Sequence, residues 1–262
     1  MQRAAILAFG FIAYGIFFLT FLYLIAFVGN LQLTPLAGAF APLAAWVPRS
    51  IDAGGATGDP AYSAVVDCLL VALFGAQHSL MARIGFKRRL KEFLPASAER
   101  SVYVLTASLV LILLFSQWRP LTATVWKAEA AWAQALGWSL YALGFGMVLL
   151  STFLLDHLEL FGLKQAWAQW RGGEARPPQF AMPLLYRLIR HPIYLGFLLA
   201  FWGTAEMTAG HLLFAAAMTG YILVAIRFEE RDLVRFHGQL YERYRERVPM
   251  LLPYKGWGRG LE

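Results

Sequence analysis

The chain has 262 residues, of which 59% are hydrophobic and 15% are charged, and its formal net charge is +7 at pH 7. A typical soluble domain carries about 25% charged residues and a smaller apolar fraction, so this composition excludes an ordinary soluble protein. Long uncharged stretches account for the difference, and the segment from Ala4 to Pro48 contains no charged residue at all. The composition therefore indicates an integral membrane protein.

The uncharged stretches are long enough to cross a bilayer as helices. A hydrocarbon core of about 30 Å requires roughly 20 helical residues, and only helices or closed barrels satisfy the backbone in lipid. The stretches lack the alternation that is typical of barrel strands. We therefore predict an all-α, polytopic membrane helix bundle with about five to six transmembrane helices. The predicted segments are 4–28, 65–82, 101–118, 132–155, a short arm at 193–205 and its return at 207–226.

Basic residues predict how these helices are oriented. If the N-terminus is cytoplasmic and successive helices alternate, the cytoplasmic segments hold 20 of the 23 Lys and Arg residues, and only Arg49, Arg119 and Lys127 lie outside. The positive-inside rule thus places both termini in the cytoplasm. The excess of positive charge is therefore explained by the orientation of the protein in a lipid membrane, and it does not indicate nucleic-acid binding.

Several connecting residues also carry expectations. The apolar segment Leu31–Val47 is interrupted by prolines, so we expect it at the outer interface with Trp46 as an anchor. Cys68 is the only cysteine, and we expect it to be a small, buried packing residue. Three tryptophans fit an interfacial belt: Trp118, Trp126 and Trp132.

Polar side chains gather at the cytoplasmic ends of the second and fourth predicted spans. The second span ends with Gln77, His78, Ser79 and Arg83. A single histidine at such a position is usually a hydrogen-bonded packing residue, but this density of polar groups favours a site. The fourth span ends with Asp156 and His157, which diverge by about 100° on a helix and so need partners elsewhere. We expect the two groups to converge.

The last quarter of the chain places polar clusters at both ends of an apolar hairpin. The arm at 193–205 is roughly 20 Å long as a helix, too short to cross the bilayer fully. Gly196 and Gly203 predict close helix contact within a tight hairpin. Ionisable groups at a membrane boundary are costly to desolvate, so the clusters indicate a site, although membrane-edge anchoring is the plainer alternative.

These residues resemble a known superfamily of membrane methyltransferases, the isoprenylcysteine carboxyl methyltransferase superfamily. The matching elements are Arg190-His191-Pro192-x-Tyr194-x-Gly196, Glu229-Glu230-x-x-Leu233, Gly238, Tyr241, Tyr244 and Pro249. The upstream segments 77–83 and 156–165 resemble its bacterial NnrU-type branch and, within that branch, the methanethiol S-methyltransferases. The similarity extends over most of the chain.

The resemblance implies methyl transfer from S-adenosylmethionine to a small thiol, methanethiol above all, at the cytoplasmic side of a bacterial inner membrane. It implies one domain, 1–262, with an acceptor-side bundle at 1–180 and a cofactor-binding hairpin and C-terminal segment at 181–262. The cofactor-binding residues that it implies are His191, Tyr194, Gly196, Glu229, Glu230, Tyr241 and Tyr244. The catalytic candidates are His78, Arg83, Asp156, His157 and Arg190.

A thiol must lose its proton to attack, and even cysteine has a pKa of ~8.5, so the site needs a base or a cation. His78, Asp156 and His157 are the candidate bases, and Arg83 is a candidate cation. Arg190 faces either the carboxylate of the cofactor or the substrate. The histidines form no i,i+4 pair and there is one cysteine, so we expect no metal.

Two alternatives remain open at this stage. One is methylation of a larger lipidic substrate, such as a prenylated thiol acid or a phospholipid amine. The other is a non-enzymatic NnrU-like membrane protein that supports nitrogen-oxide metabolism.

Overall fold

The structure is a computed structural model that describes residues 2–31, 46–175 and 180–254. Five helices in this part of the chain are long and apolar enough to cross a membrane, and the chain is an all-α integral membrane bundle, as predicted. They are α1 (Gln2–Val28), α3 (Pro60–Ala82), α5 (Ala96–Gln117), α6 (Ala131–Leu155) and α11 (Ala209–His237). A sixth apolar helix, α10 (Pro192–Trp202), is shorter. Of the predicted interfacial segment 31–47, residues 32–45 lie outside the described residues.

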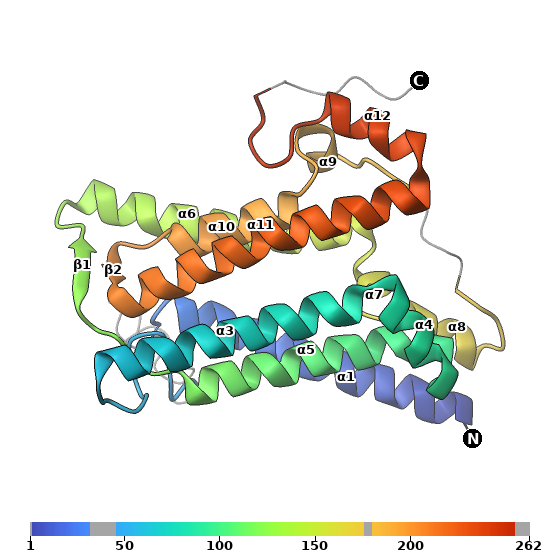
Figure 1. The fold of residues 1–262 in the computed structure, drawn as a ribbon, viewed down its shortest axis with the longest axis horizontal. Helices are drawn as coiled ribbons and strands as arrows, with labels where there is room; N and C mark the ends of the chain where they lie inside the picture. Colours follow the sequence, from blue (N-terminus) through green and yellow to red (C-terminus); the bar gives the residue numbers. More distant parts are fainter. Residues whose placement is uncertain (1, 32–45, 176–179, 255–262) are drawn as a thin grey trace.

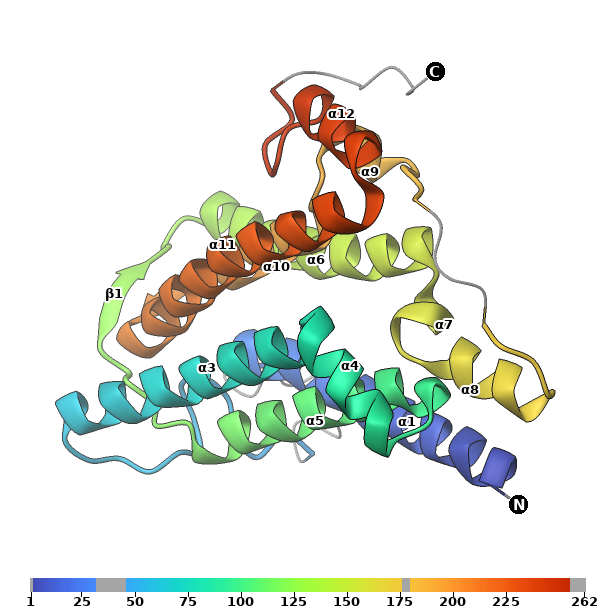
Figure 2. The same ribbon diagram turned by 45° about the vertical axis from the view of Figure 1, so that its right-hand side comes forward.

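The five long helices and the shorter α10 form two layers, with α1, α3 and α5 in one and α6, α10 and α11 in the other (Figures 1 and 2). Aromatic side chains from both layers fill the core. Phe27 and Phe115 come from the first layer, and Phe145, Phe201 and Phe214 come from the second. These rings are buried and contact one another in tilted and edge-to-face arrangements. Such contacts have preferred geometries, so they stabilise the packing of one layer on the other.

Short helices gather at one end of the bundle, near the start of α1, and a small sheet closes the other end (Figure 1). The short helices are α4 (Ile84–Phe93), α7 (His157–Leu160), α8 (Leu163–Trp170), α9 (Leu185–Leu188) and α12 (Gln239–Arg247). At the far end β1 (Thr124–Lys127) pairs antiparallel with β2 (Glu206–Thr208), and Lys127 forms a 2.9 Å ion pair with Glu206. Strands of three and four residues are too short to show a sequence pattern, so this sheet was not expected.

Glycines set the contact between α10 and its neighbour. A Cβ atom on Gly196 would lie 2.7 Å from the carbonyl oxygen of Gly144, and one on Gly203 would lie 2.6 Å from the backbone nitrogen of Tyr141. Both neighbours belong to α6, which is the helix that α10 contacts most extensively. The predicted close contact is thus present, but its main partner is α6 and not α11, the other arm of the hairpin.

Three expectations from the sequence were wrong in detail. Trp118 is 1% exposed in the core and donates a 3.0 Å hydrogen bond to the carbonyl of Ile51, so it is not an interfacial anchor. Cys68 is exposed on the surface of α3 instead of buried. The third span starts at Ala96, earlier than predicted, because Arg100 extends from the helix to the carbonyl oxygen of Leu160 and so has a partner at the bundle end.

Candidate functional site

The two arms of the predicted hairpin meet at their polar ends. Arg190 and His191, directly before α10, both contact Glu230 near the end of α11. The guanidinium nitrogens Nε and Nη2 of Arg190 lie 2.7 Å from Oε1 of Glu230, and Nε2 of His191 lies 3.1 Å from the same oxygen. Pro192 begins α10, where the missing N–H costs no helical hydrogen bond, and this start places His191 at the polar mouth.

A second pair, beside the first, joins the same two helices. The hydroxyl of Tyr194 donates a 2.7 Å hydrogen bond to Oε2 of Glu229. Within the described part of the chain, Oε1 of Glu229 accepts no hydrogen bond. The half-buried carboxylate therefore has spare capacity to accept one from a ligand.

The charge of Glu229 acts on five tyrosines, which come from five different helices. They are Tyr103 of α5, Tyr186 of α9, Tyr194 of α10, Tyr221 of α11 and Tyr241 of α12. A carboxylate with aromatic side chains in its neighbourhood is a favourable environment for a cation, because both the charge and aromatic ring faces attract it.

The C-terminal segment is fastened to this centre by Arg190. Its Nη1 donates to the carbonyl oxygens of Arg245, at 3.0 Å, and Val248, at 2.5 Å, and its backbone N–H donates to Pro249. With Nε and Nη2 on Glu230, most donors of Arg190 are used within the protein. Arg190 thus holds the C-terminal segment against the hairpin, which favours a positioning role over contact with the cofactor carboxylate.

Tyr241 and Tyr244 of α12 are buried, and they pack in a small apolar cluster with Val248. The hydroxyl of Tyr244 donates a 2.6 Å hydrogen bond to the carbonyl of Tyr186, whereas that of Tyr241 has no partner among the described residues. Burial raises the pKa of both phenols, so both are neutral donors near pH 7. An unpaired buried hydroxyl is costly, and the one on Tyr241 is available to a ligand.

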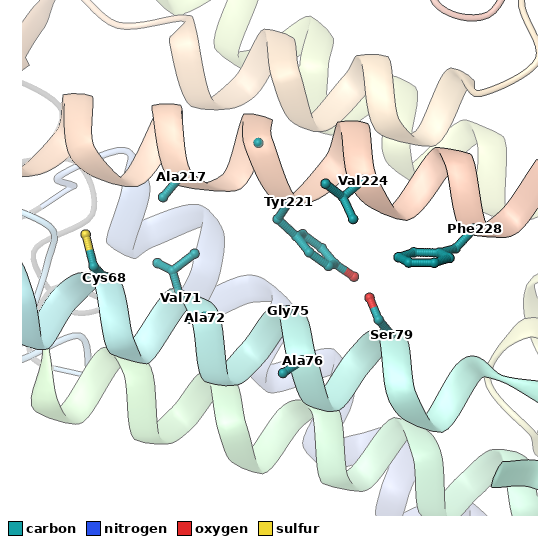
Figure 3. A pocket seen from close by; sticks show the side chains of 11 residues that line it. Cys68, Val71, Ala72, Gly75, Ala76, Ser79, Ala217, Tyr221, Val224 and Phe228 are labelled. Atoms are coloured by element: carbon teal, nitrogen blue, oxygen red, sulfur yellow. The ribbon is translucent and has the colours of Figure 1, made fainter.

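A second polar group lies on the facing layer, around His78 of α3. Its Nε2 lies 2.7 Å from the hydroxyl of Tyr103, while its Nδ1 is buried with no partner in the described part of the chain. The ring of Tyr221 stands edge-on to His78 at 6.4 Å between centroids. Figure 3 shows the hydroxyls of Tyr221 and Ser79 pointing toward one another.

Arg83 ends α3 and connects the two layers. Its Nη1 forms a 2.9 Å ion pair with Asp232 of α11, and its Nε donates to the carbonyl of Ser79. Its guanidinium lies 5.2 Å from the centre of the Phe228 ring. The predicted cation is therefore paired with a carboxylate three residues beyond Glu229.

Tyr103 and Tyr221 connect the two polar groups. Tyr103 contacts His78 directly and lies within electrostatic range of Glu229, and Tyr221 does the same through its ring and its hydroxyl. The predicted cofactor residues and the predicted base His78 are thus brought to the same end of the bundle.

Asp156 and His157 bond to other partners. Asp156 accepts from the backbone N–H of Glu159, which caps α7, and pairs with Lys164. The hydrogen bond from Lys164 lowers the pKa of Asp156. Both ring nitrogens of His157 are engaged, Nε2 with Tyr14 and Nδ1 with Thr152, each at 2.9 Å.

The predicted convergence of His78 with Asp156 and His157 is wrong, because His157 bonds to Tyr14 and Thr152 while His78 bonds to Tyr103. Arg100 of α5 donates a 2.8 Å hydrogen bond to the carbonyl of Leu160 in α7, and its guanidinium lies 5.6 Å from the centre of the Tyr103 ring. Burial lowers the pKa of His157, which keeps its ring neutral and hydrogen-bonded in the fold. Asp156 and His157 therefore shape α7, and Arg100 connects α7 to the ring that contacts His78.

Sequence reasoning missed three residues of this centre: Tyr103, Tyr221 and Asp232. The first two lie inside apolar runs, where a tyrosine is usually a packing residue, and no spacing rule relates them to Glu229. Gly196, which was predicted at the cofactor, contacts α6 instead through its Cα face. Among the described residues, no group of three or more His, Cys, Asp and Glu side chains is arranged to hold a metal ion.

The fold and the ionisable residues at one end of the bundle define a polytopic membrane protein with a candidate polar site. Comparison with known proteins makes the class specific. The chain is 48% identical to Methanethiol S-methyltransferase 2 of Bradyrhizobium diazoefficiens over 253 residues, covering 96% of this chain and 91% of the relative. It is 45% identical to the Methanethiol S-methyltransferase of Mycobacterium tuberculosis, covering 97% and 98% of the two chains, and 45% identical to that of a Pseudomonas species, covering 94% and 89%.

The chain belongs to the methanethiol S-methyltransferase family. The resemblance seen in the sequence is thereby confirmed over nearly the full length. No family model and no solved structure matches the chain.

Proposed function

We propose that this protein transfers a methyl group from S-adenosylmethionine to methanethiol and forms dimethyl sulfide. The observation that carries the proposal is the joining of His191 and Tyr194 with Glu229 and Glu230 at one end of the bundle. The relatives that cover almost all of the chain are named for this activity.

The residues around Glu229 fit a cationic nucleoside cofactor. A sulfonium is attracted by the carboxylate and by tyrosine ring faces, and the free hydroxyl of Tyr241 offers a donor to its polar groups. His191, Tyr194, Glu229, Glu230, Tyr241 and Tyr244 would hold the cofactor. When bound, it supplies an electrophilic methyl group on a positively charged sulfur.

We assign the acceptor to the facing layer and the cofactor to the hairpin, so residues 1–180 form the acceptor side and residues 181–262 form the cofactor side. His78 is the base that fits best, because its Nδ1 is unpaired and its Nε2 is held by Tyr103. The ion pair Arg83–Asp232 joins the ends of α3 and α11, and Arg83 also donates to the carbonyl of Ser79, the residue after His78.

His78 would take the thiol proton at its unpaired Nδ1, while Tyr103 holds its Nε2. The thiolate would then face the methyl group that the bound cofactor supplies, and the cofactor would leave as a neutral thioether, so no redox partner would be needed. Positioning and removal of water provide the rest of the acceleration. Asp156 and His157 act as positioning residues, through α7 and Arg100.

We further propose that the active end faces the cytoplasm of a bacterial inner membrane. The start of α1, the helices α4 and α8, and α12 all lie at that end (Figures 1 and 2). They carry or border the basic segments that the positive-inside rule assigns to the cytoplasm.

One experiment tests the proposal against its alternatives. Purified protein is titrated with S-adenosylmethionine by calorimetry and then supplied with methanethiol, and headspace dimethyl sulfide is measured. We expect cofactor binding and product formation. Cofactor binding without product, but with methylation of a prenylated thiol acid or a phospholipid amine, would favour a lipidic acceptor. Absence of cofactor binding would favour a non-enzymatic role.

A further inference from the structure

A groove runs between α3 and α11 on the outside of the bundle, with a volume of about 430 Å³ (Figure 3). Both helices are membrane-spanning, so its open side borders lipid. The wall is made almost entirely of small or apolar side chains. It includes Val71, Ala72, Ala76, Ala217 and Val224.

The groove leads to the centre described above. Its two hydroxyl groups belong to Ser79 and Tyr221, and Phe228 lies at the same end, beneath the Arg83 guanidinium. On its inner side Tyr221 packs against Phe74 and His78, with ring centroids 5.8 and 6.4 Å apart. The Tyr221 ring thus stands between the lipid-facing groove and the proposed base.

Gly75 allows Tyr221 to occupy this place. A Cβ atom on Gly75 would lie 2.7 Å from Cδ2 of the Tyr221 ring, closer than such atoms approach in proteins. The ring therefore packs directly on the backbone of α3. It has space on the groove side, because the neighbouring positions 72, 76, 217 and 220 are alanine or glycine.

We propose that this groove is the binding and entry site through which apolar thiols pass from the lipid to the reaction centre, with Tyr221 as the residue that separates the two. The inference rests on the proposed function. An uncharged thiol partitions into lipid, so an apolar surface route suits it better than a polar one. A groove of this volume is in the range of drug-sized pockets and exceeds what a one-carbon thiol fills. Longer alkanethiols consequently bind in it as well.

The test compares groove-filling variants with a matched control on the same helix. Ala76→Phe and Ala217→Phe place a ring in the groove, whereas Leu69→Phe enlarges an exposed side chain of α3 that does not line it. We expect both groove variants to raise the KM for methanethiol at least tenfold, while kcat and the Kd for S-adenosylmethionine stay within twofold of the wild type. Leu69→Phe leaves all three unchanged.

Competition by 1-hexanethiol supplies a second measurement. In the wild type it competes with methanethiol, and in Ala76→Phe its inhibition constant rises by a larger factor than the KM for methanethiol. An unchanged KM in both groove variants, with altered stabilisation by added phospholipid, would show that a lipid chain occupies the groove and would overturn the inference. A wild-type protein that forms no dimethyl sulfide would instead overturn the proposed function, so the two failures are distinguishable.

Discussion

The hydroxyl of Tyr194 donates a 2.7 Å hydrogen bond to the carboxylate of Glu229, and this bond joins α10 to α11 at the polar end of the bundle. Thirty-five residues separate the two in sequence. The bond leaves the other carboxylate oxygen, Oε1, available to a ligand, and the proposed cofactor site depends on this feature.

Replacing Glu229 with Gln should weaken cofactor binding strongly. The change keeps the shape of the side chain and a group that can accept from Tyr194 but removes the negative charge that attracts a sulfonium. We expect the Kd for S-adenosylmethionine to rise at least tenfold in calorimetry. Tyr194→Phe should have a smaller effect in the same direction. An E229Q variant that binds the cofactor normally would show that the cation lies elsewhere.

His78→Gln should lower turnover without affecting cofactor binding. General-base catalysis contributes about 10²–10⁴ in rate, so we expect kcat to fall by roughly that factor. Tyr103→Phe removes the hydrogen bond at Nε2 and should shift the pH profile of kcat while reducing it less. A His78→Gln enzyme with normal kcat, or with a lost cofactor Kd, would contradict the assignment of this histidine to the acceptor side.

Arg190→Lys should destabilise the C-terminal segment. Lysine keeps the positive charge opposite Glu230 but cannot reproduce the planar set of donors that also reaches the carbonyls of Arg245 and Val248. We expect a lower Tm in detergent and faster proteolysis between residues 239 and 254. Arg187→Lys, at an exposed neighbouring position, serves as the control. Equal proteolysis in the two variants would argue against the fastening role of Arg190.

Stability should fall as the pH decreases below about 6.5, in part because of His157. Burial holds the pKa of this ring below its ordinary value of 6.5, so the unfolded chain takes up the proton at a higher pH than the folded protein. The free energy of unfolding therefore decreases as pH falls from 6.5 through the folded pKa. Thermal denaturation of His157→Gln should show a smaller decrease of Tm between pH 7 and pH 5.

Asp156 titrates in a different window and provides the comparison. The hydrogen bond from Lys164 holds its pKa below the ordinary 3.8, so its contribution to stability is present above 3.8 and is lost as pH falls through the folded value. Asp156→Asn should leave the change between pH 7 and pH 5 as in the wild type. It should also leave the cofactor Kd within twofold and slow turnover moderately, because Asn still caps α7. Loss of cofactor binding in this variant would refute the division into acceptor and cofactor sides.

The lengths of the hydrophobic segments were sufficient to predict the spanning helices of the fold. Each spanning helix was predicted because a bilayer demands an apolar segment of minimum length, and that demand is local. The residues at the foot of the hairpin were also predicted, since ionisable groups at a membrane boundary are unusual enough to be noticed one at a time.

Other features depend on contacts that no local pattern encodes. Trp118 lies at the end of a predicted span, as an interfacial anchor would. In the structure it is packed against core aromatic side chains and hydrogen-bonded to the carbonyl of Ile51. The sequence analysis expected Gly196 to contact the other arm of the hairpin, but it contacts α6. A glycine permits close approach by any helix and does not indicate which helix will approach. Likewise Tyr103 and Tyr221 join the site only because α5 and α11 are packed against α3.

The sequence by itself determined that the chain is a membrane helix bundle with ionisable residues at one boundary, because lipid imposes a cost on every polar group one residue at a time. Only the tertiary structure decided which of those residues share a centre. Tyr103 and Tyr221 connect His78 to the neighbourhood of Glu229, whereas Asp156 bonds within its own segment and His157 bonds to Tyr14 of α1. Charge and hydrogen-bond pairing depend on distances that helix packing sets.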